Sequence, residues 1–286
     1  MLVNIRHRQL YVRHSINSSP EFPNTTIFFV HGAMASMENY RFQFAKFEAL
    51  FEHVVAYDYF GCGMSPKLED SWESYSTEQH SLDLAFVFHK YKSNRNILVG
   101  HSFGTNQVLR LCMDPETLGE ITGVVLLAPA IFPDGGHWIF RLPEWFLSWI
   151  QPKLSESFAE RAFHANTREA KTEEHAELLR YALQRAGSNN VHVFKSFYNQ
   201  IKFIKQTEVE QRVPGPIPIE LVVGSADLLT PMDMALRMKQ WLDARIGTST
   251  MACDIRVVDL SAHQLMEEQP EQVNQLIETF CRQVLE

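Results

Sequence analysis

The stretch Asn96-Ile97-Leu98-Val99-Gly100-His101-Ser102-Phe103-Gly104-Thr105 joins a short apolar run to a segment with helical spacing. The apolar run predicts a buried strand, and residues 105–113 predict a helix directly after it. Between them lies the pattern G-x-S-x-G. Small residues two positions before and after a serine permit a very tight turn, and Gly100 and Gly104 meet that need. We therefore expect Ser102 at the tip of this turn, where the helix dipole favours developing negative charge.

Two roles fit a serine in this position. It can be a nucleophile that attacks a carbonyl group, or it can be a structural cap of the helix that follows. The pattern itself is short and recurs by chance. The choice therefore depends on whether the chain also supplies a base, an acid and backbone hydrogen-bond donors.

Short apolar runs bounded by turn residues recur along the chain and alternate with helical segments. Their apolar residues are consecutive, which is typical of strands buried on both faces of a parallel sheet. The alternation favours right-handed crossovers. The sequence thus predicts an α/β fold, with a mostly parallel open sheet and flanking helices. The predicted strands are residues 26–30, 53–57, 96–99, 123–127, 219–223 and 254–258, with 9–13 as an N-terminal edge strand.

Helical spacing outside the long gap between residues 127 and 219 predicts four helices. They cover residues 76–92, 105–113, 231–244 and 270–285. In the first of these, Leu82, Phe86 and Tyr91 lie near one face of the helix. Ala85 and Phe88 lie beside them, so we expect these residues to form the apolar side of the helix.

The long gap has almost wholly helical spacing. A structureless loop of that length is implausible in a compact domain. We interpret residues 131–212 as a helical lid inserted into an α/β core formed by residues 1–130 and 213–286, with residues 214–218 as the return linker.

The lid opens on an aromatic stretch at residues 138–150. Trp138, Trp145 and Trp149 are its most prominent members. Such residues could line an apolar acyl channel, seal the lid onto the core, or touch a membrane surface. Arg141 and Pro143 exclude a membrane-spanning helix here. His137, also in the lid, is a further candidate for contact with substrate.

The segment His31-Gly32-Ala33 follows the predicted strand at residues 26–30. Gly32 permits a sharp backbone turn, which directs the N–H of Ala33 toward the serine. Together with the N–H of Phe103, it is expected to form an oxyanion hole. His31 is expected to hold this loop through backbone hydrogen bonds rather than to touch substrate.

A serine hydroxyl needs a base to take its proton, and the base needs an acid to fix its tautomer. In enzymes built on such a sheet, the acid and then the histidine follow the final strands. Asp227 follows the strand at 219–223 and His263 follows the strand at 254–258, so we expect these two as acid and base. Asp233 and Asp259 compete with Asp227, and Asp259 is the stronger rival because it also ends a strand. Asp58 precedes two glycines and is expected to anchor a tight turn instead.

Five ordered motifs resemble the α/β-hydrolase fold superfamily, most closely its branch with an abhydrolase-type core and a helical cap. They are His31-Gly32, Asp58-x-x-Gly61-x-Gly63-x-Ser65, Gly100-His101-Ser102-Phe103-Gly104, Gly224-Ser225-Ala226-Asp227 and Ala262-His263. The resemblance covers nearly the whole chain outside the lid. It implies Ser102 as nucleophile, Asp227 as acid, His263 as base, and Ala33 and Phe103 as backbone donors.

The sequence departs from that superfamily at two positions. Ala262 stands where many relatives have glycine, and Asn106 stands where a small residue is usual. The serine also separates this chain from relatives resembling epoxide hydrolases and haloalkane dehalogenases, in which an aspartate is the nucleophile.

Composition and charge exclude several other classes of function. The net charge is -8, with 26 basic and 34 acidic residues interspersed, so there is no basic patch for nucleic acid. No apolar segment approaches the roughly 18 to 20 residues that span a bilayer, and no secretory signal is expected. The four cysteines are far apart and are expected to be free thiols. We expect a cytoplasmic protein without a metal or cofactor.

These observations predict a serine hydrolase. Its expected reaction is cleavage of an ester-type acyl bond, through an acyl-enzyme, in a lipid-like or other apolar small molecule. Two alternatives stay open: a carbon–carbon bond hydrolase that uses the same three residues, and a non-catalytic binding or scaffold protein on the same fold.

Overall fold

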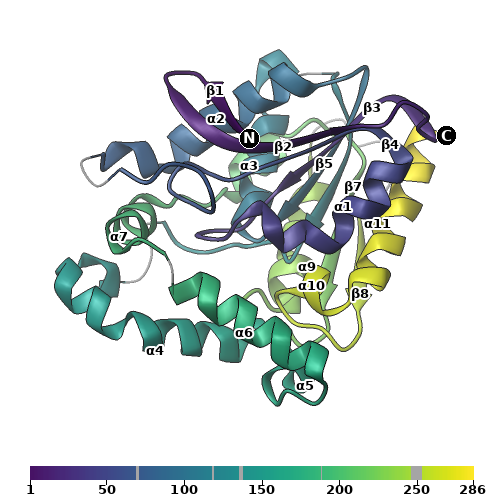
Figure 1. Ribbon diagram of the computed structural model, residues 1–286. Coiled ribbons are helices and arrows are strands. Elements are labelled where there is room, and N and C mark those ends of the chain that lie inside the picture. Colours follow the sequence, from purple (N-terminus) through teal and green to yellow (C-terminus); the bar gives the residue numbers. More distant parts are fainter. Residues whose placement is uncertain (69–70, 118, 135–137, 188, 246–252) are drawn as a thin grey trace.

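The centre of the molecule is a twisted sheet, seen in Figure 1, which shows the computed structural model. The structure describes residues 1–68, 71–117, 119–134, 138–187, 189–245 and 253–286. Within them the sheet has eight strands in the order β1-β2-β4-β3-β5-β6-β7-β8. They are β1 (Leu2–Ile5), β2 (Arg8–Ile16), β3 (Phe22–Val30), β4 (Phe51–Tyr57), β5 (Arg95–His101), β6 (Ile121–Leu127), β7 (Ile219–Gly224) and β8 (Asp254–Val258). β2 pairs antiparallel with β1 and β4, and the other neighbours are parallel.

Helices cover both faces of this sheet. One face is buried by α1 (Arg41–Leu50) and α11 (Pro270–Leu285), and the other by α2 (Thr77–Tyr91), α3 (Phe103–Cys112) and α9 (Met232–Asp243). Because both faces are covered, the strands β5, β6 and β7 are buried at nearly every position. The α/β fold predicted from the sequence is therefore confirmed. Its rigid parallel strands end at one edge, where open α/β sheets place their sites.

The N-terminal part of the sheet differs from the prediction. Residues 9–13 do form a strand, as part of β2, but they do not form the edge of the sheet. β1 pairs outside β2, with Asn4 opposite Gln9. β1 has only four residues, of which one is buried, so it leaves no apolar run for sequence analysis to detect.

The face that α2 turns toward the core also differs from the prediction. Leu82 and Phe86 are 50% and 42% exposed, whereas His80 and Asp83 are fully buried. Asp83 accepts a hydrogen bond of 3.1 Å from Arg8 Nε in β2. The ion pair lies beside the buried apolar residues Leu84, Val87 and Phe88. The prediction is therefore confirmed for Phe88 and wrong for Leu82 and Phe86.

Between β6 and β7 the described chain is mostly helical, as expected. This segment, residues 131–212, is called the insertion below. It contains α4 (Glu144–Ala162), α5 (Ala165–Arg168), α6 (Glu173–Gly187), α7 (Val191–Gln200) and α8 (Gln206–Arg212). In Figure 1, α4, α5 and α6 lie beyond one end of the sheet, apart from the helices that flank it. The division into core and lid at residues 131 and 212 stays a prediction, and His137 lies outside the described residues.

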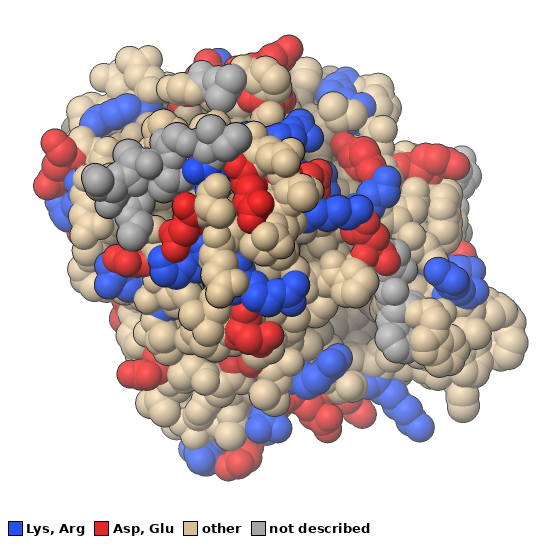
Figure 2. All heavy atoms as spheres, turned by 180° about the vertical axis from the view of Figure 1, so that it is seen from behind, with Lys and Arg blue, Asp and Glu red and all other residues tan. Residues whose placement is uncertain are grey.

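Charges are mixed on the surface. Figure 2 shows lysines and arginines interspersed with aspartates and glutamates over the face in view. In the part of the chain that the structure describes, no helix combines the length and apolar character needed to cross a bilayer.

Candidate active site

Ser102 lies between β5 and α3, where the sequence places it. Its φ of 53° and ψ of -117° are costly for a residue with a side chain. Its N–H donates a hydrogen bond of 2.9 Å to the Leu127 carbonyl in the neighbouring strand. Its side chain makes no capping hydrogen bond to α3. The structure therefore gives no support to the alternative in which this serine merely caps the helix.

The two glycines of the turn are required by close backbone contacts. A Cβ atom on Gly100 would lie 2.7 Å from the carbonyl oxygen of Gly104. A Cβ atom on Gly104 would lie 2.2 Å from the carbonyl oxygen of Val30 at the end of β3. Both distances are far shorter than a van der Waals contact. The backbones of the turn, α3 and β3 therefore leave no room for a side chain at either glycine.

This packing predicts the effect of Gly104→Ala. The new methyl group would meet backbone, which cannot rotate away, so we expect a loss of about 3 kcal/mol in the free energy of unfolding. Denaturant unfolding measures it, with Gly187→Ala as the control, because a Cβ atom there has no neighbour within 4 Å. Equal stability of the two variants would show that the turn does not need a glycine at position 104.

The loop after β3 lies directly against the serine. A Cβ atom on Gly32 would lie 3.2 Å from the Ser102 Cβ. His31 holds this loop: its Nδ1 donates to the Gly32 carbonyl oxygen at 2.8 Å, and its Nε2 accepts from the Tyr59 N–H at 3.0 Å. Burial lowers the pKa of His31 to about 3, so the ring is neutral. These contacts match the structural role expected for His31, and the direction of the Ala33 N–H toward the serine stays a prediction.

Asp227 and His263 form a buried pair. The aspartate Oδ2 lies 2.9 Å from the histidine Nδ1, and their side chains are 1% and 5% exposed. Asp227 also accepts hydrogen bonds from the N–H groups of Leu229 and Thr230 and from the Thr230 hydroxyl, at 2.7 to 2.8 Å. Burial alone raises the pKa of Asp227, but the charge of His263 and these hydrogen bonds outweigh it and lower that pKa below its ordinary value. Asp227 is thus held as a carboxylate facing the imidazole.

The three expected residues reach the same edge of the sheet from different strands. Ser102 follows β5, Asp227 follows β7 and His263 follows β8, and these strands run parallel. With its Nδ1 toward Asp227, His263 has Nε2 left for another partner. Among the described residues no hydrogen bond joins that atom to Ser102 Oγ, so this contact stays a prediction. Such bonds are often long before a substrate is bound.

The competing aspartates do not reach the histidine. Asp259 and Asp233 are exposed, the first after β8 and the second in the first turn of α9. Asp58 is buried and accepts hydrogen bonds from the N–H groups of Met37 and Met64, at 2.8 and 2.7 Å. Burial raises the pKa of Asp58 to about 6. It therefore anchors the turn, as expected.

Sequence analysis missed the residues that hold the histidine loop. Glu268, nine-tenths buried, accepts from the Ala262 N–H at 2.7 Å, on the core side. It also accepts from the His164 N–H at 2.8 Å and the Thr167 hydroxyl at 2.7 Å, both in the insertion. One carboxylate thus joins the loop that carries His263 to the insertion. No pattern in the sequence signals this link, because His164 and Thr167 lie about a hundred residues from Glu268 along the chain.

Two further residues, Arg185 and Asn106, connect the insertion to the rest of the chain. Arg185 in α6 donates to Asn39 Oδ1 at 2.7 Å and pairs with the buried Glu267 at 3.5 Å. Asn106, where a small residue is usual in related sequences, donates to the Ala130 carbonyl at 3.0 Å and accepts from the Ile204 N–H at 2.7 Å. Residues of the insertion thus contact the rest of the chain at several places.

Comparison with known proteins bears on the family and the fold of this chain. The chain matches the model of the alpha/beta hydrolase family over residues 27–276. It is 25% identical to human protein ABHD8 over 260 residues, which is 90% of this chain and 55% of that protein, and the mouse protein of the same name matches equally. The chain thus spans about half the length of the curated relatives it matches.

Solved structures resemble the whole chain in fold. A thermophilic esterase from Thermogutta terrifontis superposes with a TM-score of 0.77 at 16% identity, covering 100% of this chain and 99% of the esterase. An enol-lactonase from Burkholderia xenovorans LB400 also gives a TM-score of 0.77, at 17% identity, covering 99% of this chain and 100% of the lactonase. At such identities the likeness shows the fold alone. The family model, however, matches most of the sequence, and the chain therefore belongs to the alpha/beta hydrolase family.

Proposed function

We propose that this protein is a serine hydrolase that cleaves ester-type acyl bonds of apolar small molecules. One observation carries the proposal: a strained serine turn lies beside the Gly32 loop, at the edge of the sheet that also holds the buried Asp227–His263 pair. In this reading the strain at Ser102 keeps its hydroxyl presented at the turn, ready for attack.

The proposed reaction has two halves. Ser102 Oγ attacks the carbonyl carbon while His263 Nε2 takes its proton, and Asp227 stabilises the imidazolium through Nδ1. The N–H groups of Ala33 and Phe103 bind the oxyanion; Phe103 is the first residue of α3, where N–H groups have no partner within the helix. His263 then protonates the leaving alcohol, and a water molecule activated by His263 hydrolyses the acyl-enzyme.

Buried aromatic side chains pack on Phe103 at the serine turn, and on the ground of these apolar surroundings we propose an apolar substrate. The Phe103 ring lies 5.2 Å from that of Phe197 in α7 and 6.1 Å from that of Phe203, between centroids. Both partners come from the insertion, but from its second half. The three tryptophans at the start of the insertion are strongly exposed, so the interpretation that they seal it onto the core does not hold for them.

A series of p-nitrophenyl esters with lengthening acyl chains tests this function. We expect kcat/KM to rise by about fourfold for each buried methylene, up to about eight carbons or more. Activity on the acetate alone would contradict the apolar-channel interpretation. Inactivity on every ester would favour either the carbon–carbon bond hydrolase or the non-catalytic scaffold, and reaction of the serine with a fluorophosphonate distinguishes these two.

The contacts of Glu268 predict a second effect on the proposed reaction. In Glu268→Ala, the Ala262 N–H loses its acceptor, so the loop that carries His263 is expected to shift and kcat to fall by about tenfold to a hundredfold, with KM nearly unchanged. Steady-state kinetics on an ester measures this. The exposed Glu271→Ala is the matched control. An unchanged kcat in a folded Glu268→Ala variant would show that the loop does not depend on this carboxylate.

The same proposal includes a cytoplasmic location and a reaction that proceeds without a metal ion or cofactor. All four cysteines are buried as free thiols, which fits a reducing compartment. The reaction as written uses only side chains, backbone donors and water. Fractionation of cells that express the full chain tests the location.

A further inference from the structure

Helix α4 exposes two tryptophans on one face. Trp145 and Trp149 are 71% and 72% exposed and lie four residues apart, so they project from the same side of the helix. The Phe146 ring joins them, with ring centroids 5.8 and 5.7 Å from theirs. We call Trp145 and Trp149 the tryptophan face. Tryptophan is usually highly buried in folded proteins, so two exposed neighbours call for an explanation.

The helix is held by its opposite side. Leu147 and Ala159 are buried at 1% and 6% exposure, and Ala162 is fully buried. α4 also packs closely against α6 and α7. The tryptophan face is therefore turned outward by the packing of the helix, and covering it needs a partner from outside the described chain rather than a rotation of α4.

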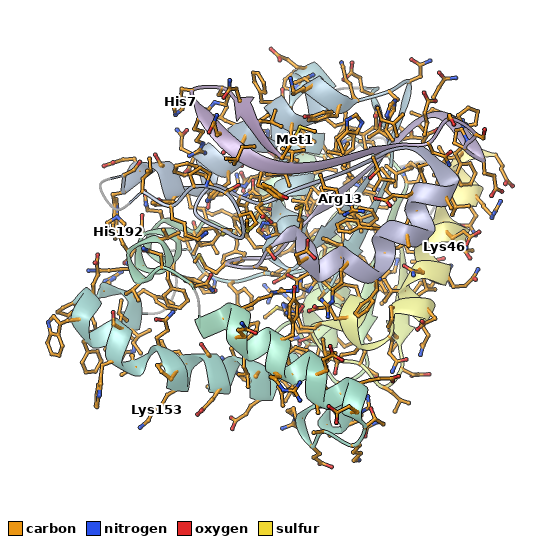
Figure 3. The ribbon with its side chains drawn as sticks, in the orientation of Figure 1. Met1, His7, Arg13, Lys46, Lys153 and His192 are labelled. Carbon is orange, nitrogen blue, oxygen red and sulfur yellow. The ribbon has the colours of Figure 1, made fainter. Side chains whose placement is uncertain are left out.

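Exposed cations lie in the sequence on either side of this face, in a chain whose net charge is -8. Arg141 and Lys153 flank the face and are exposed, and in the described part of the chain neither forms an ion pair. Figure 3 shows Lys153 extending from α4 away from the body of the molecule. The one acid between them, Glu144, lies 3.0 Å from His192. The acids Glu156 and Glu160 begin about one turn beyond the lysine.

We propose that the tryptophan face docks on an anionic phospholipid surface. Indole rings favour the headgroup layer of a bilayer, because one end of the ring is apolar and its N–H finds polar partners. Flanking cations add attraction to anionic lipids, of about 1 kcal/mol each near the surface. This arrangement of aromatic residues beside unpaired cations is that of a helix lying in the interface rather than crossing it. The inference does not depend on the proposed hydrolase activity.

A second copy of this chain fits the face less well. Two tryptophans together offer at most about 500 Å² of contact, whereas a stable protein interface buries about 800 Å² on each partner. The cores of protein interfaces are also depleted of lysine, which flanks this face. A lipid surface needs neither a large matching area nor a complementary shape.

Vesicle flotation tests the proposal with the full chain. We expect the protein to float with vesicles of phosphatidylcholine and phosphatidylserine, and the double variant Trp145→Ala, Trp149→Ala to lose about tenfold or more in partitioning. The matched control is Leu82→Ala, Phe86→Ala, which removes another exposed apolar pair four residues apart, on α2. The control is expected to float like the unaltered protein. Equal flotation of the tryptophan variant and the control would overturn the proposal.

Two further measurements extend the test, and the first of them needs no variant. In the unaltered protein, tryptophan emission is expected to shift to the blue on these vesicles and to be quenched by brominated lipids. Arg141→Gln, Lys153→Gln is expected to remove the preference for phosphatidylserine over phosphatidylcholine alone, as added salt also does. An unshifted emission, or dimers in sedimentation velocity that vanish in the tryptophan variant, would assign this face to something other than lipid.

Discussion

Ser102→Ala is expected to lower kcat for ester hydrolysis by about 10⁶-fold, to the small rate left to the remaining site groups. The reason is that the acyl-enzyme cannot form without the Oγ atom, whichever substrate is bound. Folding is expected to be unchanged, because the serine side chain makes no capping hydrogen bond. Rates on the best p-nitrophenyl ester measure the loss, with thermal unfolding as the check on structure.

Ser225→Ala is the matched control for this variant. Ser225 is exposed and lies two residues before Asp227, so it shares the site loop but no step of the reaction. We expect it to keep the activity of the unaltered protein. Ester turnover that persists in Ser102→Ala would remove the nucleophile from the proposed mechanism and, with it, the acyl-enzyme.

Asp227→Asn is expected to lower kcat by about 10⁴-fold. The amide has nearly the shape of the carboxylate, but its NH₂ group cannot accept a hydrogen bond from His263 Nδ1–H. The imidazole then loses both the tautomer that the base needs and the negative charge that stabilises the imidazolium. In contrast to the serine variant, a slow reaction with a fluorophosphonate is expected to remain, because the nucleophile is still present.

Asp259→Asn tests the rival acid under the same conditions. Asp259 is exposed after β8 and has no contact with the histidine, so its variant is expected to be fully active. A large loss in Asp259→Asn together with normal activity in Asp227→Asn would reverse the assignment. Because the pKa of Asp227 lies below its ordinary value, this carboxyl group is expected to stay ionised to a lower pH than an ordinary aspartate does.

The parts of the fold that the sequence predicts well are those specified by local pattern. The central strands are continuous apolar runs because both of their faces are covered, and the serine turn is recognisable because two glycines must sit where backbone touches backbone. Helix α1 is different: its buried side includes Gln43, whose Nε2 donates to the Met266 carbonyl, so no clean apolar stripe marks it. In α2, Asp83 is buried against Arg8 beside the apolar residues of the core side, while Leu82 and Phe86 are exposed, and helical spacing does not show this.

The residues of the candidate site also differ in how well the sequence predicts them. Asp227 and His263 follow strands and could be placed from their order along the chain, and the structure brings them together. Glu268, Arg185 and Thr230 act through contacts between the insertion, the core and the loops after the last strands, which no local spacing encodes. The exposure of the α4 tryptophans could not be predicted either. The sequence shows that these residues are aromatic, but not whether another helix covers them.

The central claim is that Ser102 carries the acyl group, and covalent labelling tests it most directly. The folded protein is treated with a fluorophosphonate, and intact-mass and peptide mass spectrometry locate the adduct. We predict one adduct per chain, on the peptide containing Ser102, and none in Ser102→Ala. An adduct on a different serine, or no adduct on the folded protein, would contradict the account.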